Sequence, residues 1–178
     1  MNNQLVFGDK YRLVWRKISE KKVGEVRNYT TDGKGYRQVK ILLDDEIMGK
    51  KKMRFLATTW GARGPEIFVS SLFLAIPKKL REAGIWHEIG HIHYEHFLRS
   101  DFLNQDQLRT SRISAIKKGQ VIPEEAVADR FAVAQAGKDA LSNFLNYALT
   151  TRPTGGKQSW NEIGRKELEI RIAAIQRL

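Results

Sequence analysis

Two histidines four residues apart, with a glutamate directly after the first, are the residues of this chain best suited to chemistry. They lie in the segment His87-Glu88-Ile89-Gly90-His91. On a helix, positions four apart share one face, so both imidazoles can bind one metal ion. The carboxylate of Glu88 points about a quarter turn away and can take a proton from a water molecule at that metal. The pattern predicts zinc-dependent peptide hydrolysis with Glu88 as the catalytic base.

A catalytic zinc takes three protein ligands, and the segment 123–129, which reads PEEAVAD, can supply the third. Glu125 and Asp129 are four residues apart and share a helix face. One of them can bind the metal while the other accepts a hydrogen bond from the free ring nitrogen of a ligand histidine. Glu124 is an alternative ligand. The small side chain of Ala128 would let the two helices approach each other.

The other two histidines of the chain are His93 and His96. Both are rotated away from His87 and His91 on a continuous helix, so we expect neither to bind the metal. A metzincin would need a third histidine at position 97 and a glycine at position 94, but the chain has Phe97 and Tyr94 there. An oxyanion stabiliser is required for the predicted reaction, and Tyr94, Tyr147 and His96 are candidates by residue type alone.

Composition limits the kind of metal site and the cellular setting. The chain has 178 residues and no cysteine, so a zinc ion must be held by nitrogen and oxygen. The first ten residues lack a basic start followed by an apolar core, so we expect no secretory signal. The longest apolar run, residues 67–76, is shorter than the about 20 residues that span a bilayer. We therefore expect a soluble, cytoplasmic protein with no membrane partner.

The formal net charge is +11, and the excess is concentrated near the N-terminus. Residues 1–60 contain fourteen lysines and arginines against seven acidic residues. Such a region can attract nucleic acid or an acidic partner, although the same charge also serves solubility alone. No known nucleic-acid-binding signature lies in this third of the chain.

Periodicity predicts an α+β fold, with a β-rich N-terminal part followed by helices. With the two motifs above, we expect these helices to form a helical zincin core that contains an active-site helix and a glutamate helix. Asp32-Gly33 predicts a hairpin turn, and Ser159 with Glu162 predicts a capping box at the start of the last helix. Gly84 and Gly90 fall inside a helix, which indicates a close approach of another helix there.

We expect strands over 11–18, 24–29, 36–43, 53–60 and 66–71, and a short helix within 42–52. Longer helices are expected over 78–98, 105–117, 123–137, 138–150 and 159–178. One metallopeptidase domain over 1–178 is expected, with 1–60 either an N-terminal extension or part of the protease sheet.

The segment from His87 to His91, with His96 five residues later, resembles the H-E-L-G-H-x-x-x-x-H segment of the ImmA/IrrE family of gluzincin metallopeptidases. The run from Glu124 to Ala132 resembles the E-E-x-x-A-D/N-x-F-A helix of that family. HtpX-like proteases share E-x-x-A-D, and this resemblance implies that Glu125 is a zinc ligand. The missing membrane spans argue against the HtpX-like branch. The resemblance covers about residues 64–137 well, and residues 1–60 match nothing in the family.

Two further segments resemble parts of these enzymes. Residues 67–69 resemble the edge strand on which such enzymes lay the substrate, and the segment from Arg165 to Ile175 weakly resembles their R-x-x-R-I ends. The family resemblance implies regulated cleavage of one protein, often a DNA-binding repressor. The alternative hypothesis is a catalytically latent, zinc-binding regulatory or nucleic-acid-associated module.

Overall fold

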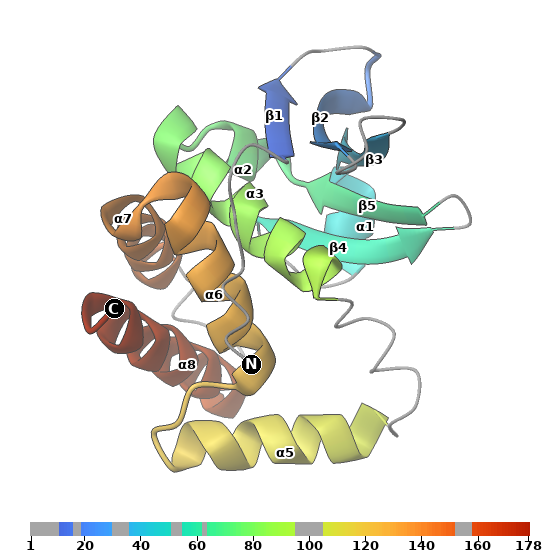
Figure 1. Cartoon of the computed structure of the whole chain (residues 1–178). Coiled ribbons are helices and arrows are strands. Elements are labelled where there is room, and N and C mark those ends of the chain that lie inside the picture. Colours follow the sequence, from blue (N-terminus) through green and yellow to red (C-terminus); the bar gives the residue numbers. More distant parts are fainter. Residues whose placement is uncertain are drawn as a thin grey trace. The chain divides into compact units, whose positions relative to one another are not determined.

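The structure is a computed structural model that describes residues 11–15, 19–29, 36–50, 55–61, 64–94, 105–151 and 158–178. The chain forms two compact units, residues 1–77 and residues 78–178 (Figure 1). The first unit contains a β-sheet and the second is helical, so the predicted α+β class is confirmed. The single metallopeptidase domain over residues 1–178 stays a prediction.

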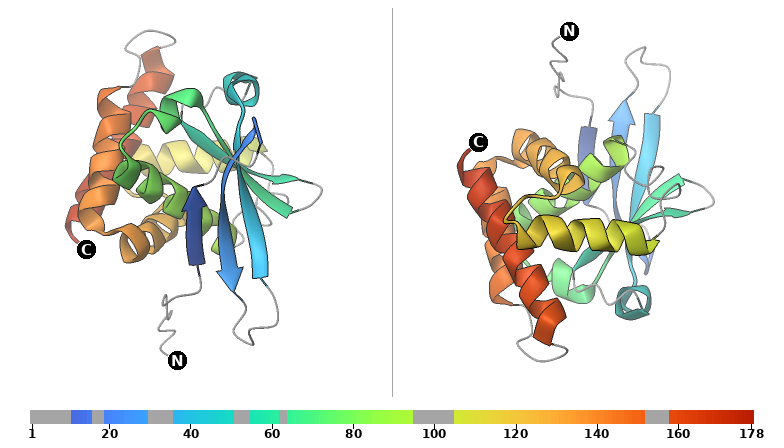
Figure 2. Two further views of the ribbon diagram at one scale, coloured as in Figure 1. Left: turned by 90° about the horizontal axis from the view of Figure 1, so that it is seen from above. Right: turned by 90° about the horizontal axis from the view of Figure 1, so that it is seen from below.

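The first unit is built on a five-stranded sheet. Strands β1, β2 and β3 lie side by side, as the left view of Figure 2 shows, and the strand order is β1-β2-β3-β5-β4. Strand β3 pairs with β5 in parallel, whereas the other neighbours are antiparallel. The bounds are β1 Tyr11–Trp15, β2 Lys22–Tyr29, β3 Tyr36–Leu43, β4 Leu56–Gly61 and β5 Gly64–Val69.

The predicted strands are confirmed to within a few residues wherever the structure describes them. The Asp32-Gly33 turn lies outside the described residues, but Tyr29 is opposite Tyr36 in an antiparallel pair, as a hairpin requires. Alternation places apolar side chains of neighbouring strands opposite one another, with Val26 beside Val39 and Ile41 beside Ile67. All four of these side chains are buried. The sheet therefore forms the core of the first unit on one of its faces.

The expectation that β5 is an edge strand is wrong. β5 pairs with β3 on one side and with β4 on the other, for example through Ile67, which is opposite both Ile41 and Thr58. Its backbone groups are therefore used within the sheet, and an extended substrate cannot pair with it. The strands β1, β2 and β3, which come before residue 60, belong to the same sheet as β5.

The predicted strand over 66–71 also ends early. Ser70 Oγ accepts a hydrogen bond from the backbone N–H of Phe73 at 3.1 Å and caps the short helix α2, Ser71–Leu74. This side-chain cap competes with continued strand pairing and ends β5 at Val69. The predicted short helix within 42–52 is α1, Asp45–Lys50, and its buried Met48 packs with Phe68.

The second unit consists of helices whose predicted positions are confirmed. They are α3 Lys78–His93, α5 Gln105–Lys117, α6 Pro123–Ala136, α7 Lys138–Thr150 and α8 Gln158–Gln176. The predicted extension of α3 to position 98 lies outside the described residues. Helix α8 begins one residue before Ser159, so Ser159 is inside the helix and not at the predicted N-cap. None of the helices in the described part of the chain is both long enough and apolar enough to cross a membrane.

The two glycines of α3 mark places where other helices come close, as predicted. A Cβ atom at Gly90 would lie 2.8 Å from Cα of Ala128 on α6, and one at Gly84 would lie 2.9 Å from the ring of Phe144 on α7. Both distances are shorter than a normal carbon–carbon contact. Glycine and the small Ala128 therefore allow α3 and α6 to pack with their backbones nearly touching.

Candidate metal centre

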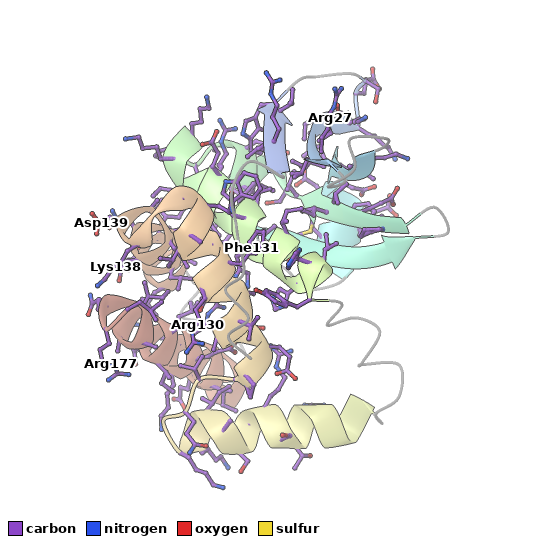
Figure 3. All side chains as sticks on the ribbon, in the orientation of Figure 1. Arg27, Arg130, Phe131, Lys138, Asp139 and Arg177 are labelled. Atoms are coloured by element: carbon purple, nitrogen blue, oxygen red, sulfur yellow. The ribbon has the colours of Figure 1, made fainter. Side chains whose placement is uncertain are left out.

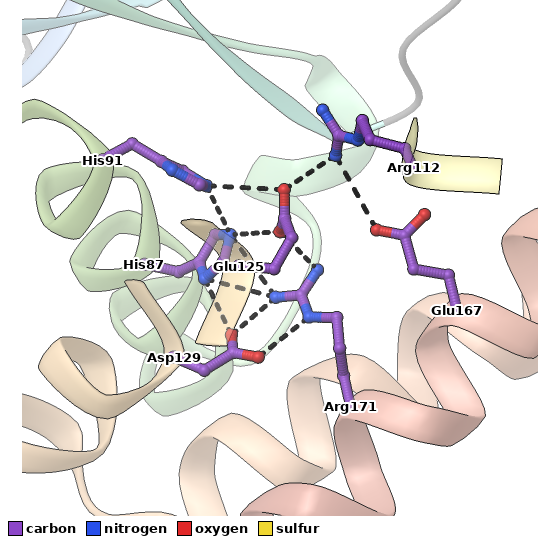
Figure 4. A network of polar contacts seen from close by, with 7 residues as sticks. All are labelled: His87, His91, Arg112, Glu125, Asp129, Glu167 and Arg171. Carbon is purple, nitrogen blue, oxygen red and sulfur yellow. Dashed lines mark hydrogen bonds and ion pairs between the residues drawn. The ribbon is translucent and has the colours of Figure 1, made fainter. Parts of the chain in front are cut away.

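His87 and His91 lie one turn apart on α3 and turn their rings toward the same point (Figure 4). Pro77 precedes the helix, where its missing N–H costs no hydrogen bond. The two Nε2 atoms are 3.1 Å apart, and the rings are nearly perpendicular at 88°. The helical spacing thus produces the paired imidazoles that the sequence predicted.

Glu125 comes from the first turn of α6, where the helix dipole favours a carboxylate. Its Oε2 is 3.3 Å from Nε2 of His87, and its Oε1 is 3.8 Å from Nε2 of His91. The donor atoms of these three residues all lie within 4.8 Å of one another, so the group can hold a metal ion. Glu124, the alternative ligand, is exposed and does not belong to this group.

Asp129 lies one turn after Glu125 on the same face of α6 and is buried. Its Oδ1 is 2.8 Å from Nδ1 of His87, as the sequence predicted for a carboxylate that orients a ligand histidine. This contact keeps a proton on Nδ1 and leaves Nε2 directed at Glu125 and His91. The next two residues of α6, which are labelled in Figure 3, differ in exposure: Arg130 is exposed to solvent and Phe131 is buried.

Arg171 on α8 is a buried residue of the centre to which the sequence analysis gave no role. Its Nε and Nη2 atoms donate to Asp129 at 2.9 and 2.6 Å, and its Nη1 lies 3.0 Å from Oε2 of Glu125. The position of Arg171 in the sequence did indicate that its side chain needs a buried partner. Arg171 shares a helix face with the apolar positions Leu168, Ile172 and Ile175, and a cation on such a face must find a buried partner.

Arg112 on α5 is the second cation that the sequence analysis did not place here. Its Nη2 is 2.8 Å from Oε1 of Glu125 and 3.9 Å from Oε1 of Glu167 on α8. Half of the Arg112 side chain is exposed, whereas Glu125 is buried. No local pattern singles out Arg112, because its partners are on other helices.

Burial and charge change the proton affinities of the groups in this centre. Burial and Arg171 lower the pKa of His87, but Asp129 and Glu125 outweigh them and raise that pKa to about 9. Burial raises the pKa of Asp129, yet Arg171 and His87 bring it down to about 2. The same cations hold the pKa of Glu125 well below its ordinary value, against the opposing effect of burial. Without a metal, the centre is therefore a set of buried ion pairs.

The structure describes all but one of the other candidate residues. Glu88 follows His87 on α3 and is partly exposed. His93 is exposed, and its ring contacts those of Tyr94 and Phe131, so it does not belong to the metal-binding group. Tyr147 is on α7, and His96 lies outside the described residues.

Two of the three donor separations fit a tetrahedral ion. Bonds of about 2.0–2.1 Å from zinc to nitrogen and oxygen place neighbouring donors about 3.3 Å apart. The 3.1 Å between the Nε2 atoms of the two histidines and the 3.3 Å between Nε2 of His87 and Oε2 of Glu125 agree with this value, whereas the 3.8 Å between Nε2 of His91 and Oε1 of Glu125 is longer. Two imidazoles and one carboxylate are also a donor set that leaves a position for water.

Comparison of the chain with protein-family models, curated proteins and solved structures finds no match in any of the three. The resemblance to the ImmA/IrrE family therefore stays a prediction, based on the motifs of α3 and α6.

Proposed function

We propose that this protein is a zinc-dependent endopeptidase that hydrolyses a specific protein. The observation that carries the proposal is the convergence of His87 and His91 on α3 with Glu125 on α6, with all donor atoms within 4.8 Å. Two histidines and a glutamate, with a second glutamate beside the first histidine, are the residues that metal-assisted peptide hydrolysis uses.

When bound, zinc would supply a Lewis acid that polarises a peptide carbonyl and lowers the pKa of a water molecule. The carboxylate of Glu88 would take the proton from that water and pass it to the leaving amine. Asp129 would keep His87 in the required tautomer, and Arg171 would keep Asp129 in place through two hydrogen bonds.

The first test is the metal content of the purified protein. We expect about one zinc ion per chain, measured together with iron and manganese by mass spectrometry, and a clear loss in Glu125→Ala. Glu124→Ala is the matched control, because it removes the adjacent carboxylate, which is exposed. The proposed site is contradicted if both variants lose the same amount of metal. It is also contradicted if wild type holds no metal after zinc is supplied at neutral pH.

The second test separates catalysis from metal binding. Glu88→Gln should keep its zinc and lose the cleavage of a quenched fluorescent peptide library that the wild type cleaves. A wild type that holds zinc and cleaves nothing would instead support the alternative, a latent metal-binding regulatory module. One observation favours this alternative: both oxygens of Glu125 contact arginine guanidinium groups.

The basic N-terminal third adds a hypothesis about partners. A net positive region would suit an acidic or nucleic-acid-bound protein substrate. If polyanions neither bind the protein nor change its cleavage rate at low salt, this hypothesis is wrong.

A further inference from the structure

Each of the two carboxylate oxygens of Glu125 contacts a different arginine (Figure 4). Arg171 contacts Oε2 at 3.0 Å, and Arg112 contacts Oε1 at 2.8 Å. The same two oxygens are those that approach His87 and His91. A metal ion held by the three candidate ligands must therefore share Glu125 with two guanidinium groups, and each of them repels a divalent cation.

Arg171 is fixed in its place. Only 9% of its side chain is exposed, and it also donates two hydrogen bonds to the buried Asp129. If Arg171 moved away, the buried Asp129 would lose its arginine and the buried Glu125 would lose one of its two, which is strongly unfavourable. A metal ion therefore has to bind with Arg171 still present.

Arg112 is in the opposite situation. Its side chain is 51% exposed, and the same Nη2 atom that contacts Glu125 has a second carboxylate, that of Glu167, 3.9 Å away. Releasing Arg112 costs little on the arginine side, because water solvates the half-exposed guanidinium, and the metal ion would replace it beside the buried Glu125. A small rotation of the side chain would exchange Glu125 for Glu167 without moving a helix.

The helix that carries Arg112 is attached to the helix that carries Glu167. The right view of Figure 2 shows one end of α5 beside α8, and Nζ of Lys166 on α8 donates to the carbonyl of Lys117, the last residue of α5, at 3.2 Å. Arg112 therefore stays within reach of both carboxylates.

We propose that Arg112 is a displaceable counter-ion of this centre. It neutralises Oε1 of Glu125 in the metal-free protein and turns to Glu167 when a divalent cation binds His87, His91 and Glu125. The inference rests on the proposed metal site and adds a regulation of it: the loading of the metal competes with an arginine from α5. The contact between α5 and α8 therefore influences the affinity of the site for the metal ion.

The test is a double-mutant cycle on zinc affinity, measured by competition with a chromogenic chelator. Arg112→Ala should bind zinc about three- to tenfold more tightly than wild type, because the competing cation is gone. Glu167→Gln should bind zinc more weakly than wild type, because Arg112 has lost the partner it turns to. In the Arg112→Ala background the same Glu167→Gln change should have almost no effect.

Lys117→Ala is the matched control, since it removes one positive charge from an exposed position of the same helix. Its zinc affinity should equal that of wild type. Circular dichroism of each metal-free variant checks that the fold is kept.

Two results overturn the inference and leave the proposed function standing: weaker or unchanged zinc binding in Arg112→Ala, or an equal effect of Glu167→Gln in both backgrounds. The absence of zinc binding in wild type and in all variants overturns the proposed metal site, and this inference with it.

Discussion

Oδ1 of Asp129 lies 2.8 Å from Nδ1 of His87, on the side of the ring away from Glu125. The imidazole is thus held at both nitrogens, with a carboxylate orienting it through Nδ1 and a second carboxylate beside Nε2. Because Asp129 and Glu125 are one turn apart on α6, a single helix face supplies both contacts. The orientation of His87 therefore depends on Asp129 as much as on its own helix.

Asp129→Asn should weaken zinc binding by about 10- to 100-fold, because the amide orients the ring less well and makes its nitrogen a poorer donor. Competition with a chelator at neutral pH measures the change. Asp139→Asn is the control, since Asp139 is an exposed carboxylate on α7, labelled in Figure 3. Equal zinc affinity of the two variants would show that Asp129 does not support a metal ligand.

Arg171→Met should lower the free energy of unfolding of the metal-free protein by about 3–5 kcal/mol, because Asp129 would remain buried without its arginine and Glu125 would keep only Arg112. Urea unfolding in the presence of a chelator measures it. Arg165→Met serves as the control, because Arg165 is exposed on the same helix. If both variants lose the same small amount of stability, Arg171 is not the partner that holds the two carboxylates.

Much of the centre could be predicted from the sequence because its spacing is local. Residues four apart on one helix must share a face, which is why His87 and His91, and separately Glu125 and Asp129, could be paired in advance. Gly90 and Ala128 indicated that the two helices approach closely, and the structure places them in contact. Periodicity likewise placed most helices and strands to within a few positions, although the predicted N-cap Ser159 lies inside α8.

The features that were missed depend on contacts between distant parts of the chain. The position of β5 inside the sheet follows from its parallel pairing with β3, and no residue within β5 encodes that order. Arg112 and Arg171 reach Glu125 from helices before and after α6, so their role follows from helix packing. Arg171 alone gave a local signal, as a charged residue on an apolar helix face.

Gly90→Ala should destabilise the protein by about 1–2 kcal/mol. The new methyl group would lie 2.8 Å from Cα and 3.0 Å from the carbonyl oxygen of Ala128, and backbone atoms cannot rotate away. The overpacking costs about 1–3 kcal/mol, and the better helix propensity of alanine offsets about 1 kcal/mol of it. Zinc affinity should fall as well, because separating α3 from α6 moves His87 away from Glu125.

Gly49→Ala is the control for this change. Gly49 lies in α1, and a Cβ atom built there has no neighbour within 4 Å, so the variant should be as stable as wild type or slightly more stable. Urea unfolding and chelator competition measure both variants. Wild-type stability and zinc affinity in Gly90→Ala would contradict the close packing of α3 on α6.

Glu25→Gln should remove part of the acid sensitivity of the protein. The Glu25 side chain is buried in the sheet, 2.7 Å from Nζ of Lys22 and 2.6 Å from Nη2 of Arg27. The hydrogen bond from Lys22 lowers the pKa of Glu25, burial opposes this effect, and Arg27 lowers the pKa further, so the net shift is downward from 4.5. The stabilisation from the ionised carboxylate is therefore complete above the unfolded-state pKa and is lost as the pH falls through the lower, folded-state pKa.

Urea unfolding of wild type and Glu25→Gln between neutral pH and about pH 3 tests this dependence. At neutral pH the variant should be less stable by about 1 kcal/mol, because two part-buried hydrogen bonds to a charged group are weakened. As the pH falls below 4.5, wild type should lose this advantage and the two stabilities should converge. Glu20→Gln, at an exposed position, should follow wild type throughout. A constant difference between wild type and Glu25→Gln down to about pH 3 would mean that the ion pairs of Glu25 do not stabilise the folded sheet.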